Sequence, residues 1–169
     1  MGQKNSKKNL IGFSRRELEA ELIKMGEKPF RTKQLWHWIY HQGETGFSKM
    51  TSLGKSLRTK LQEDYILVKP EIVTQMVSED TTHKWLLKTQ DGNEVETVFI
   101  PEDERGALCV SSQVGCTLTC SFCHTGTQKL VRNLTAAEIV GQMMVARDAY
   151  NEWPSDGHDR KLTNIVMMG

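Results

Sequence analysis

Apolar residues recur at helical spacing through the first third of the chain. The spacing predicts helices over residues 14–26, 32–42 and 53–64, and the first opens with the Ser-Arg-Arg-Glu pattern of a capping box. The three helices share an apolar stripe, so we expect a small bundle over residues 1–64. Residues 1–9 are polar and lysine-rich, and we expect them to be disordered.

The period changes to that of strands after residue 65. Residues 71–78, 83–89 and 94–100 alternate or are rich in β-branched residues, and an Asp-Gly pair lies between the last two. This pattern predicts a three-stranded antiparallel meander. With an acidic linker after Pro101, it would form a region over residues 65–104.

Residues 105–169 show a third pattern. An apolar strand begins near residue 107, a capping box opens a helix over residues 135–150, and residues 162–168 form a second apolar strand. A strand, helix and strand in this order indicate a βαβ unit with parallel strands. A loop at the carboxyl end of such a strand is where β/α barrels place their chemistry.

The predicted fold class is therefore α/β, with a helical domain, a meander and the first βαβ unit of a barrel. A full barrel takes about 250 residues, which is far more than follow the linker. The second strand would leave an apolar edge uncovered. We expect a fragment of a longer enzyme, or a chain that needs a partner to finish its sheet.

Charge is distributed unevenly along the chain. Residues 1–62 carry thirteen Lys and Arg against five Asp and Glu, whereas residues 63–169 carry nine against sixteen. A basic first third is typical of a module that binds a polyanion such as nucleic acid, although a solvated basic surface would give the same count. No signal peptide or membrane-length apolar run is present, so the sequence predicts a cytoplasmic protein without membrane contact.

Three cysteines lie close together in the last third of the chain. Cys116, Cys120 and Cys123 form a C-x3-C-x2-C cluster, and Cys109 is the only other cysteine. Three thiolates are one short of the four that usually hold zinc or an iron–sulfur cluster, so one iron would stay open. Structural zinc sites usually join two distant pairs of ligands, so the pattern favours iron–sulfur, with an all-cysteine zinc site as the alternative.

This spacing is the signature of radical S-adenosylmethionine (SAM) enzymes, and a longer stretch resembles one family of them. The strings EVETVFIP at 94–101, CVSSQVGC at 109–116, RNLT at 132–135 and EIVGQ at 138–142 are similar to the RNA adenine-C2 methyltransferases, the RlmN family. The resemblance covers nearly the whole chain from about Phe13.

The resemblance implies a fold, cofactors and a substrate. The fold is a basic RNA-binding domain followed by a partial barrel that holds a 4Fe–4S cluster and SAM. The substrates are an adenine in 23S rRNA and one in tRNA, methylated at C2 through a methylcysteine. It also implies an external, flavodoxin-like electron donor and a monomeric full-length enzyme.

The resemblance also assigns roles to residues of this chain. Cys116, Cys120 and Cys123 map to the cluster ligands, and Phe122 to an aromatic residue beside SAM. Glu96 maps to the proposed proton acceptor, a task that a buried carboxylate could perform. Cys109 maps to the cysteine that forms a disulfide as the methylated RNA is released.

Some expectations separate this chain from a complete enzyme. The methylcysteine and part of the SAM site lie beyond Gly169 in the family, so we expect the 169 residues to be inactive alone. The alternatives are an adenine-C8 methyltransferase, a non-catalytic RNA-binding module with a structural metal at the cysteines, and a radical SAM enzyme acting on a protein or small molecule.

Overall fold

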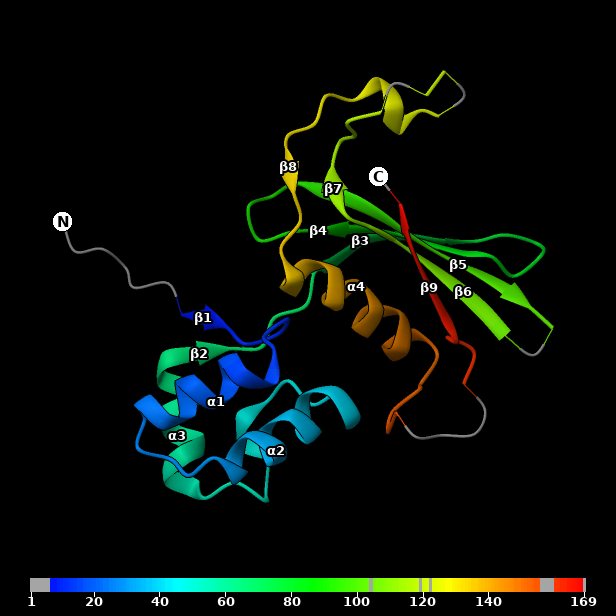
Figure 1. Ribbon diagram of the computed structural model, residues 1–169. Coiled ribbons are helices and arrows are strands. Elements are labelled where there is room, and N and C mark those ends of the chain that lie inside the picture. Colours follow the sequence, from blue (N-terminus) through cyan, green and yellow to red (C-terminus); the bar gives the residue numbers. More distant parts are fainter. Residues whose placement is uncertain (1–6, 104, 119, 122, 156–159, 169) are drawn as a thin grey trace. The chain divides into compact units, whose positions relative to one another are not determined.

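The computed structural model describes residues 7–103, 105–118, 120–121, 123–155 and 160–168 (Figure 1). These residues divide into two compact units. The first contains residues up to 68 together with 153–155, and the second contains residues 69–152 together with 160–168. Each unit is described by itself below.

The first unit is helical, as the apolar spacing predicts. Its α-helices are α1 (Arg15–Lys24), α2 (Phe30–Trp36) and α3 (Lys55–Asp64), with a 3-10 turn at Phe47–Lys49. Ser14 caps α1: its side chain accepts from the backbone of Glu17, whose carboxylate accepts from the backbone of Ser14. The predicted helices are confirmed, and the capping box forms because its two halves satisfy otherwise unpaired amides.

The second helix differs from its prediction in one respect. After Trp36 it continues as a π-helical turn, His37–His41. A wider turn rotates the following side chains relative to a 3.6-residue repeat. Leu35 and Ile39 are buried, while Trp36 and Tyr40 of the same apolar stripe are half-buried.

Residues 8 and 9 form a strand, although their composition suggests disorder. Strand β1 (Lys8–Asn9) pairs in parallel with β2 (Tyr65–Ile66), which directly follows α3. The Asn9 side-chain amide donates to the carbonyl of Val68 at 2.8 Å, and Asn9 Oδ1 accepts from the amide of Val68 at 3.3 Å. The expectation of disorder over residues 1–9 is therefore wrong for residues 8 and 9, because a tertiary partner satisfies their polar groups.

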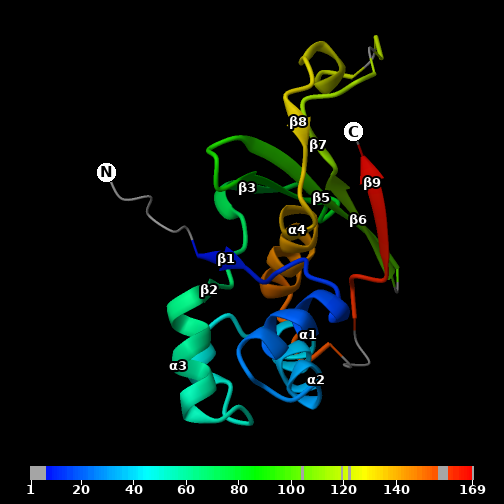
Figure 2. The same ribbon diagram turned by 60° about the vertical axis from the view of Figure 1, so that its left-hand side comes forward.

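The second unit contains a mixed five-stranded sheet of order β3-β4-β5-β6-β9. All neighbours are antiparallel except β6 and β9, which are parallel (Figure 2). Its strands are β3 (Glu71–Val77), β4 (His83–Lys88), β5 (Glu94–Glu102), β6 (Arg105–Ser111) and β9 (Asn164–Met168).

The meander and the βαβ unit share this one sheet, which the sequence analysis does not anticipate. Residues 101–103 were expected in a linker, but Pro101 pairs with Gly106 and Glu102 with Arg105 across the β5–β6 hairpin. A proline is tolerated near the end of a strand, where the ladder loses little from its missing amide. The structure therefore has continuous pairing where a boundary between residues 104 and 105 was predicted.

One face of the sheet packs against α4 (Ala136–Ala149) and forms the core of the second unit (Figures 1 and 2). Trp85, Phe99 and Leu108 are almost completely buried there, against Val145 and Ala146 of the helix. Because side chains alternate along a strand, the residues between them lie on the opposite face. In the described residues of the second unit, α4 is the only α-helix, so no α-helix of this unit covers that face.

The α/β class is confirmed, whereas the barrel stays a prediction. The five-stranded sheet includes one parallel pair, β6 and β9, with α4 between them in sequence. Strand β9 is at the edge of the sheet, and its Ile165 and Met167 are more than half exposed. In the described part of the chain, none of the helices is long and apolar enough to cross a membrane.

Candidate functional site

The three clustered cysteines lie in a loop that a short ribbon closes at its base. Strand β7 (Gln113–Val114), just after β6, pairs antiparallel with β8 (Arg132–Asn133), and Cys116 bridges to Lys129. Figures 1 and 2 show the loop extending beyond this ribbon, past the carboxyl end of β6. The loop is therefore where the sequence analysis expects the chemistry of a β/α unit.

Two glycines allow the loop to fold back on itself. Gly115 has a φ of +75°, and a Cβ there would lie 2.2 Å from the carbonyl oxygen of Lys129. At Gly126, a Cβ would lie 2.9 Å from the carbonyl oxygen of Cys120. Both positions exclude larger residues, because the backbones approach too closely for a side chain.

All three thiols are half-buried and none forms a disulfide. Cys116 Sγ accepts a hydrogen bond from the amide of Leu118 at 3.3 Å, and a turn joins the amide of Cys123 to the carbonyl of Cys120 at 3.1 Å. The thiolate is the form of cysteine that binds a metal. The loop thus begins to organise the thiols as ligands.

The donor set fits an iron–sulfur cluster in its chemistry. It offers three sulfurs from one loop, and Cys109 lies on β6 outside that loop. Across the described residues, no three Cys, His, Asp or Glu side chains are gathered as metal ligands. The three thiols would therefore have to converge when a cluster binds. Phe122, the predicted neighbour of SAM, lies outside the described residues.

The structure places Glu96 and Cys109 on the same face of the sheet. Val98 of β5 is opposite Cys109 of β6, and Glu96 lies two residues before Val98. Glu96 and Cys109 are therefore diagonal neighbours on the face away from α4. The sequence alone does not reveal this proximity, because it depends on the β5–β6 register.

Glu96 is less enclosed than a buried base would be. Its side chain is 50% exposed, and its Oε1 lies 3.0 Å from Nζ of Lys84 on the neighbouring strand. The described residues do not supply the burial that the sequence analysis invoked for this carboxylate. Its role as a proton acceptor stays a prediction.

A buried amide that the sequence analysis missed supports this corner of the sheet. Gln142 of α4 is fully buried, and its Oε1 accepts from Thr97 Oγ1 at 2.7 Å and from the amide of Ser111 at 2.8 Å. Its Nε2 donates to the carbonyl of Ser111 at 2.9 Å. Ser111 Oγ in turn donates to the carbonyl of Glu96 at 2.7 Å. Gln142 therefore ties α4 to both of the strands that carry Glu96 and Cys109.

A second missed group lies at the base of the cysteine loop. Arg132 of β8 contacts Asp91, in the β4–β5 turn, through Nε at 2.7 Å, and both of its terminal nitrogens contact the carboxylate of Glu138, at 2.9 and 2.8 Å. Both Arg132 and Glu138 lie in strings that carry the family resemblance, but neither string indicates that they contact each other. The capping box explains the contact of Glu138 with Thr135 and does not predict Arg132.

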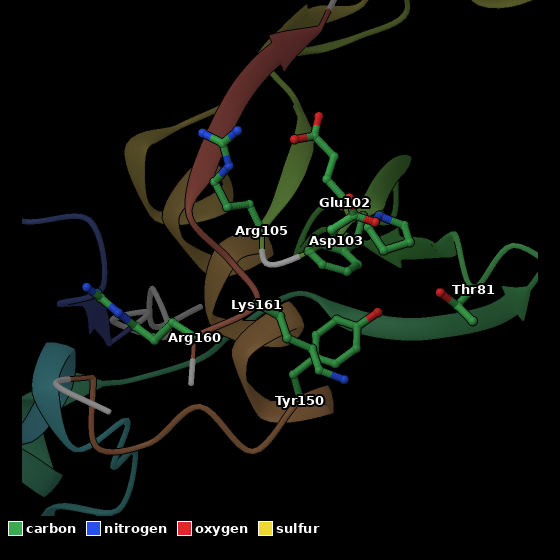
Figure 3. A pocket seen from close by; sticks show the side chains of 9 residues that line it. Thr81, Glu102, Asp103, Arg105, Tyr150, Arg160 and Lys161 are labelled. Atoms are coloured by element: carbon green, nitrogen blue, oxygen red, sulfur yellow. The ribbon is translucent and has the colours of Figure 1, made fainter. Parts of the chain in front are cut away.

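A pocket of about 320 Å³ opens at the other end of the strands (Figure 3). Tyr150 and Phe99 form its aromatic wall, and Arg105, Arg160 and Lys161 are among its charged residues. It adjoins the start of β6, whereas the cysteine loop follows the end of β6. This pocket is thus separate from the candidate chemistry.

The first unit carries cations beside exposed rings. The guanidinium of Arg15 lies 5.0 Å from the ring centre of Trp36, and that of Arg31 lies 4.8 Å from the ring centre of Phe30. The rings of His37 and His41 stack at 4.3 Å. Cations beside half-exposed rings can bind both the phosphates and the bases of a single-stranded nucleic acid.

Comparison with known proteins gives consistent matches. Residues 8–67 match the family model described as the ribosomal RNA large subunit methyltransferase N-terminal domain. A dual-specificity RNA methyltransferase RlmN of Rhodospirillum rubrum is 68% identical over 95% of this chain and 38% of that protein. One from Paramagnetospirillum magneticum is 62% identical over 98% of this chain and 37% of that protein.

A solved structure is also similar. The crystal structure of a radical SAM methyltransferase from Sphaerobacter thermophilus superposes with a TM-score of 0.83 at 40% identity, covering 96% of this chain and 46% of that one. This chain therefore spans less than half the length of the relatives that it matches.

Proposed function

We propose that this chain contributes the cluster loop and the RNA-binding domain of a radical SAM RNA methyltransferase. The chain belongs to the RlmN family over the part of those proteins that it spans. The observation that carries the proposal is the loop of three unpaired thiols after β6, in a chain similar along almost its whole length to RNA methyltransferases. As a part, it would be inactive alone.

Cys116, Cys120 and Cys123 would hold a 4Fe–4S cluster. When bound, the cluster supplies an open iron for SAM and the electron for its reductive cleavage, the electron coming from a flavodoxin-like donor. With three protein sulfurs, the loop leaves one iron free for the amino and carboxylate groups of SAM. Phe122 would lie beside that SAM.

Glu96 and Cys109 would act on the RNA adduct from the open face of the sheet. We assign to Glu96 the removal of the proton from C2 of adenine, a carbon that lacks a nucleophilic lone pair. Cys109 would attack the sulfur that joins the RNA to a cysteine supplied by the rest of a longer protein. A disulfide forms as the bond between that sulfur and the CH2 carbon on the RNA breaks, and this carbon keeps the electron pair and takes up a proton to become the methyl group of the released RNA. Their diagonal placement on adjacent strands supports one shared site.

The substrate would be an adenine of 23S rRNA and of tRNA. The basic first unit, with its cation–ring pairs, would contact phosphates and unpaired bases. We place the full-length enzyme in the cytoplasm as a monomer, without membrane contact.

Anaerobic reconstitution of the 169-residue chain tests the cluster directly. The expected result is about four irons per chain, with a reduced signal in electron paramagnetic resonance that a Cys120→Ala variant loses. A Thr117→Ala variant in the same loop is the matched control. One zinc per chain with no retained iron would contradict the proposal and favour a metal-stabilised RNA-binding module.

Mass spectrometry of RNA modified by a full-length protein containing this chain tests the reaction. The expected product is 2-methyladenosine in both 23S rRNA and tRNA. Product that is only 8-methyladenosine would overturn the C2 assignment. Modified protein or a methylated small molecule with unmodified RNA would overturn the choice of RNA.

A further inference from the structure

Arg132 joins three segments of the second unit that are far apart in sequence. Its guanidinium contacts Asp91, in the turn between β4 and β5, and Glu138, in the first turn of α4. Arg132 itself lies on β8, at the exit of the cysteine loop. One side chain therefore connects the loop to the meander and to the helix.

The contacts are those of a built cluster and not of a chance surface pair. Both oxygens of Glu138 accept from Arg132, and its Oε2 also accepts from the amide of Thr135 at 2.7 Å. The Glu138 side chain is only 13% exposed. Burial pushes the pKa of Glu138 upward, but hydrogen bonds from Arg132 and Thr135 outweigh it and lower the pKa overall.

The carboxylate of Asp91 is also held by several hydrogen bonds. Its Oδ1 accepts from Thr89 Oγ1 at 2.6 Å, and its Oδ2 accepts from Asn93 Nδ2 at 2.9 Å as well as from Arg132. The hydrogen bond from Arg132 is the largest cause of its lowered pKa. The turn is thus shaped to present a carboxylate to the base of the loop.

The loop has few other attachments to the sheet. Among the described residues between 117 and 127, every hydrogen bond stays within the loop or reaches Cys116 or Gln128. The base is held by the β7–β8 ribbon and by the amide of Val131, which donates to the carbonyl of Val114 at 2.8 Å. The direction in which the thiols project from the sheet is therefore decided at this base, where Arg132 lies.

We propose that Arg132, with Asp91 and Glu138, is a positioning residue for the three cluster thiols. It holds the base of the loop in place before any metal arrives, so that Cys116, Cys120 and Cys123 can converge on one cluster. This inference rests on the proposed function of the loop. The bidentate guanidinium provides what a lysine cannot, because a single ammonium does not match a carboxylate with two parallel hydrogen bonds.

Thiol labelling of the metal-free chain tests the clamp without reference to activity. The rates at Cys116, Cys120 and Cys123 are measured by mass spectrometry, with Cys109 on β6 as the internal reference. Arg132→Gln is expected to raise the three loop rates severalfold while leaving Cys109 unchanged. The loop labelling rates of Arg132→Lys should lie between those of the parent chain and those of Arg132→Gln. Arg105→Gln, which removes an exposed arginine at the opposite end of the same sheet, is the matched control.

Iron binding provides the second readout. Loss of a group bonded directly to a metal ligand typically weakens metal binding by about 10- to 100-fold. Arg132 contacts Asp91 and Glu138 and not the cysteines, so we expect about a tenfold loss for Arg132→Gln, the lower end of that range. Asp91→Asn, which keeps the turn but removes one anion, should give a smaller loss. If Arg132→Gln folds normally by circular dichroism and its loop rates match those of the parent chain, the inference is wrong. If the parent binds no iron yet its loop rates respond to Arg132→Gln, the clamp stands and the proposed function fails.

Discussion

The two faces of the five-stranded sheet differ in what their side chains do. The face under α4 is filled by apolar residues, and Gln142 is a buried polar side chain there whose amide is fully hydrogen-bonded. The opposite face carries Glu96 and Cys109 among half-exposed apolar residues such as Ile100 and Val166. Side chains alternate along each strand, so the same strands place core residues on one face and the residues of the proposed chemistry on the other.

This difference between the faces indicates which substitutions should change stability and which should change function. On the packed face a lost contact leaves a cavity, because neighbouring side chains cannot fully collapse into it. On the open face a lost side chain is replaced by water. Stability measurements should therefore separate the faces even though their residues alternate along the same strand.

The largest expected effect is from Trp85→Ala on the packed face. Trp85 is completely buried against the core, so its removal should lower the free energy of unfolding by about 3–5 kcal/mol. Ile100→Ala, on the open face of the adjacent strand and 44% exposed, is the control and should cost less than about 1 kcal/mol. Urea unfolding followed by fluorescence or circular dichroism measures both. Equal losses would show that the open face is packed in solution.

A smaller effect is expected from Glu138→Gln, and it should depend on pH. The folded-state pKa of Glu138 is lowered, so its stabilisation is present above the unfolded pKa and is lost as pH falls through the folded value. At pH 7 the variant should lose about 2 kcal/mol, because charged hydrogen bonds to Arg132 disappear. The difference from the parent should shrink as the pH is lowered from about 5 to about 3.

Urea unfolding at several pH values checks this expectation. Glu94→Gln, which changes an exposed glutamate of β5 without a described ion pair, is a matched control that should show little difference at any pH. If the difference in unfolding free energy between Glu138→Gln and the parent grows as the pH is lowered, this expected pH dependence is wrong.

The smallest effect is expected from Lys84→Gln on the open face. Lys84 and Glu96 are 45% and 50% exposed, and exposed pairs typically contribute about 0.2–1 kcal/mol. Added salt should reduce the parent's advantage further, because it screens exposed charges. Unfolding at low and high salt measures this. A loss above about 2 kcal/mol would show that another part of the protein or a partner buries the pair in solution.

Local patterns predicted much of the fold. The capping boxes at Ser14 and Thr135 both form, since each needs only residues three positions apart. The strands of the meander and the hairpin turn at Asp91 also appear where alternation and turn chemistry indicate. The linker expected after Pro101 is wrong because β5 continues through Pro101 and Glu102 and turns directly into β6. The acidic run carries no strand pattern of its own, so its place in a hairpin depends on the partner strand that follows.

The candidate site likewise contains some residues that the sequence pattern reveals and others that it does not. Its cysteines are recognisable from spacing alone, because cluster ligands follow the geometry of one loop. Gln142 and Arg132 carry no such signal. Each depends on which strands, turns and helices meet around it, and a polar residue in an amphipathic pattern is expected to be exposed.

By itself, the sequence determined the helices and strands, the basic first third and the three-thiol loop, because these follow from periodicity, charge and spacing along the chain. Only the tertiary structure decided that the meander and the βαβ unit share one sheet, that Glu96 and Cys109 lie diagonally on its open face, and that Arg132 anchors the loop between Asp91 and Glu138. The physical reason is that strand register and ion-pair clusters join residues of different elements, where the free energy of packing, and not local preference, selects the partner.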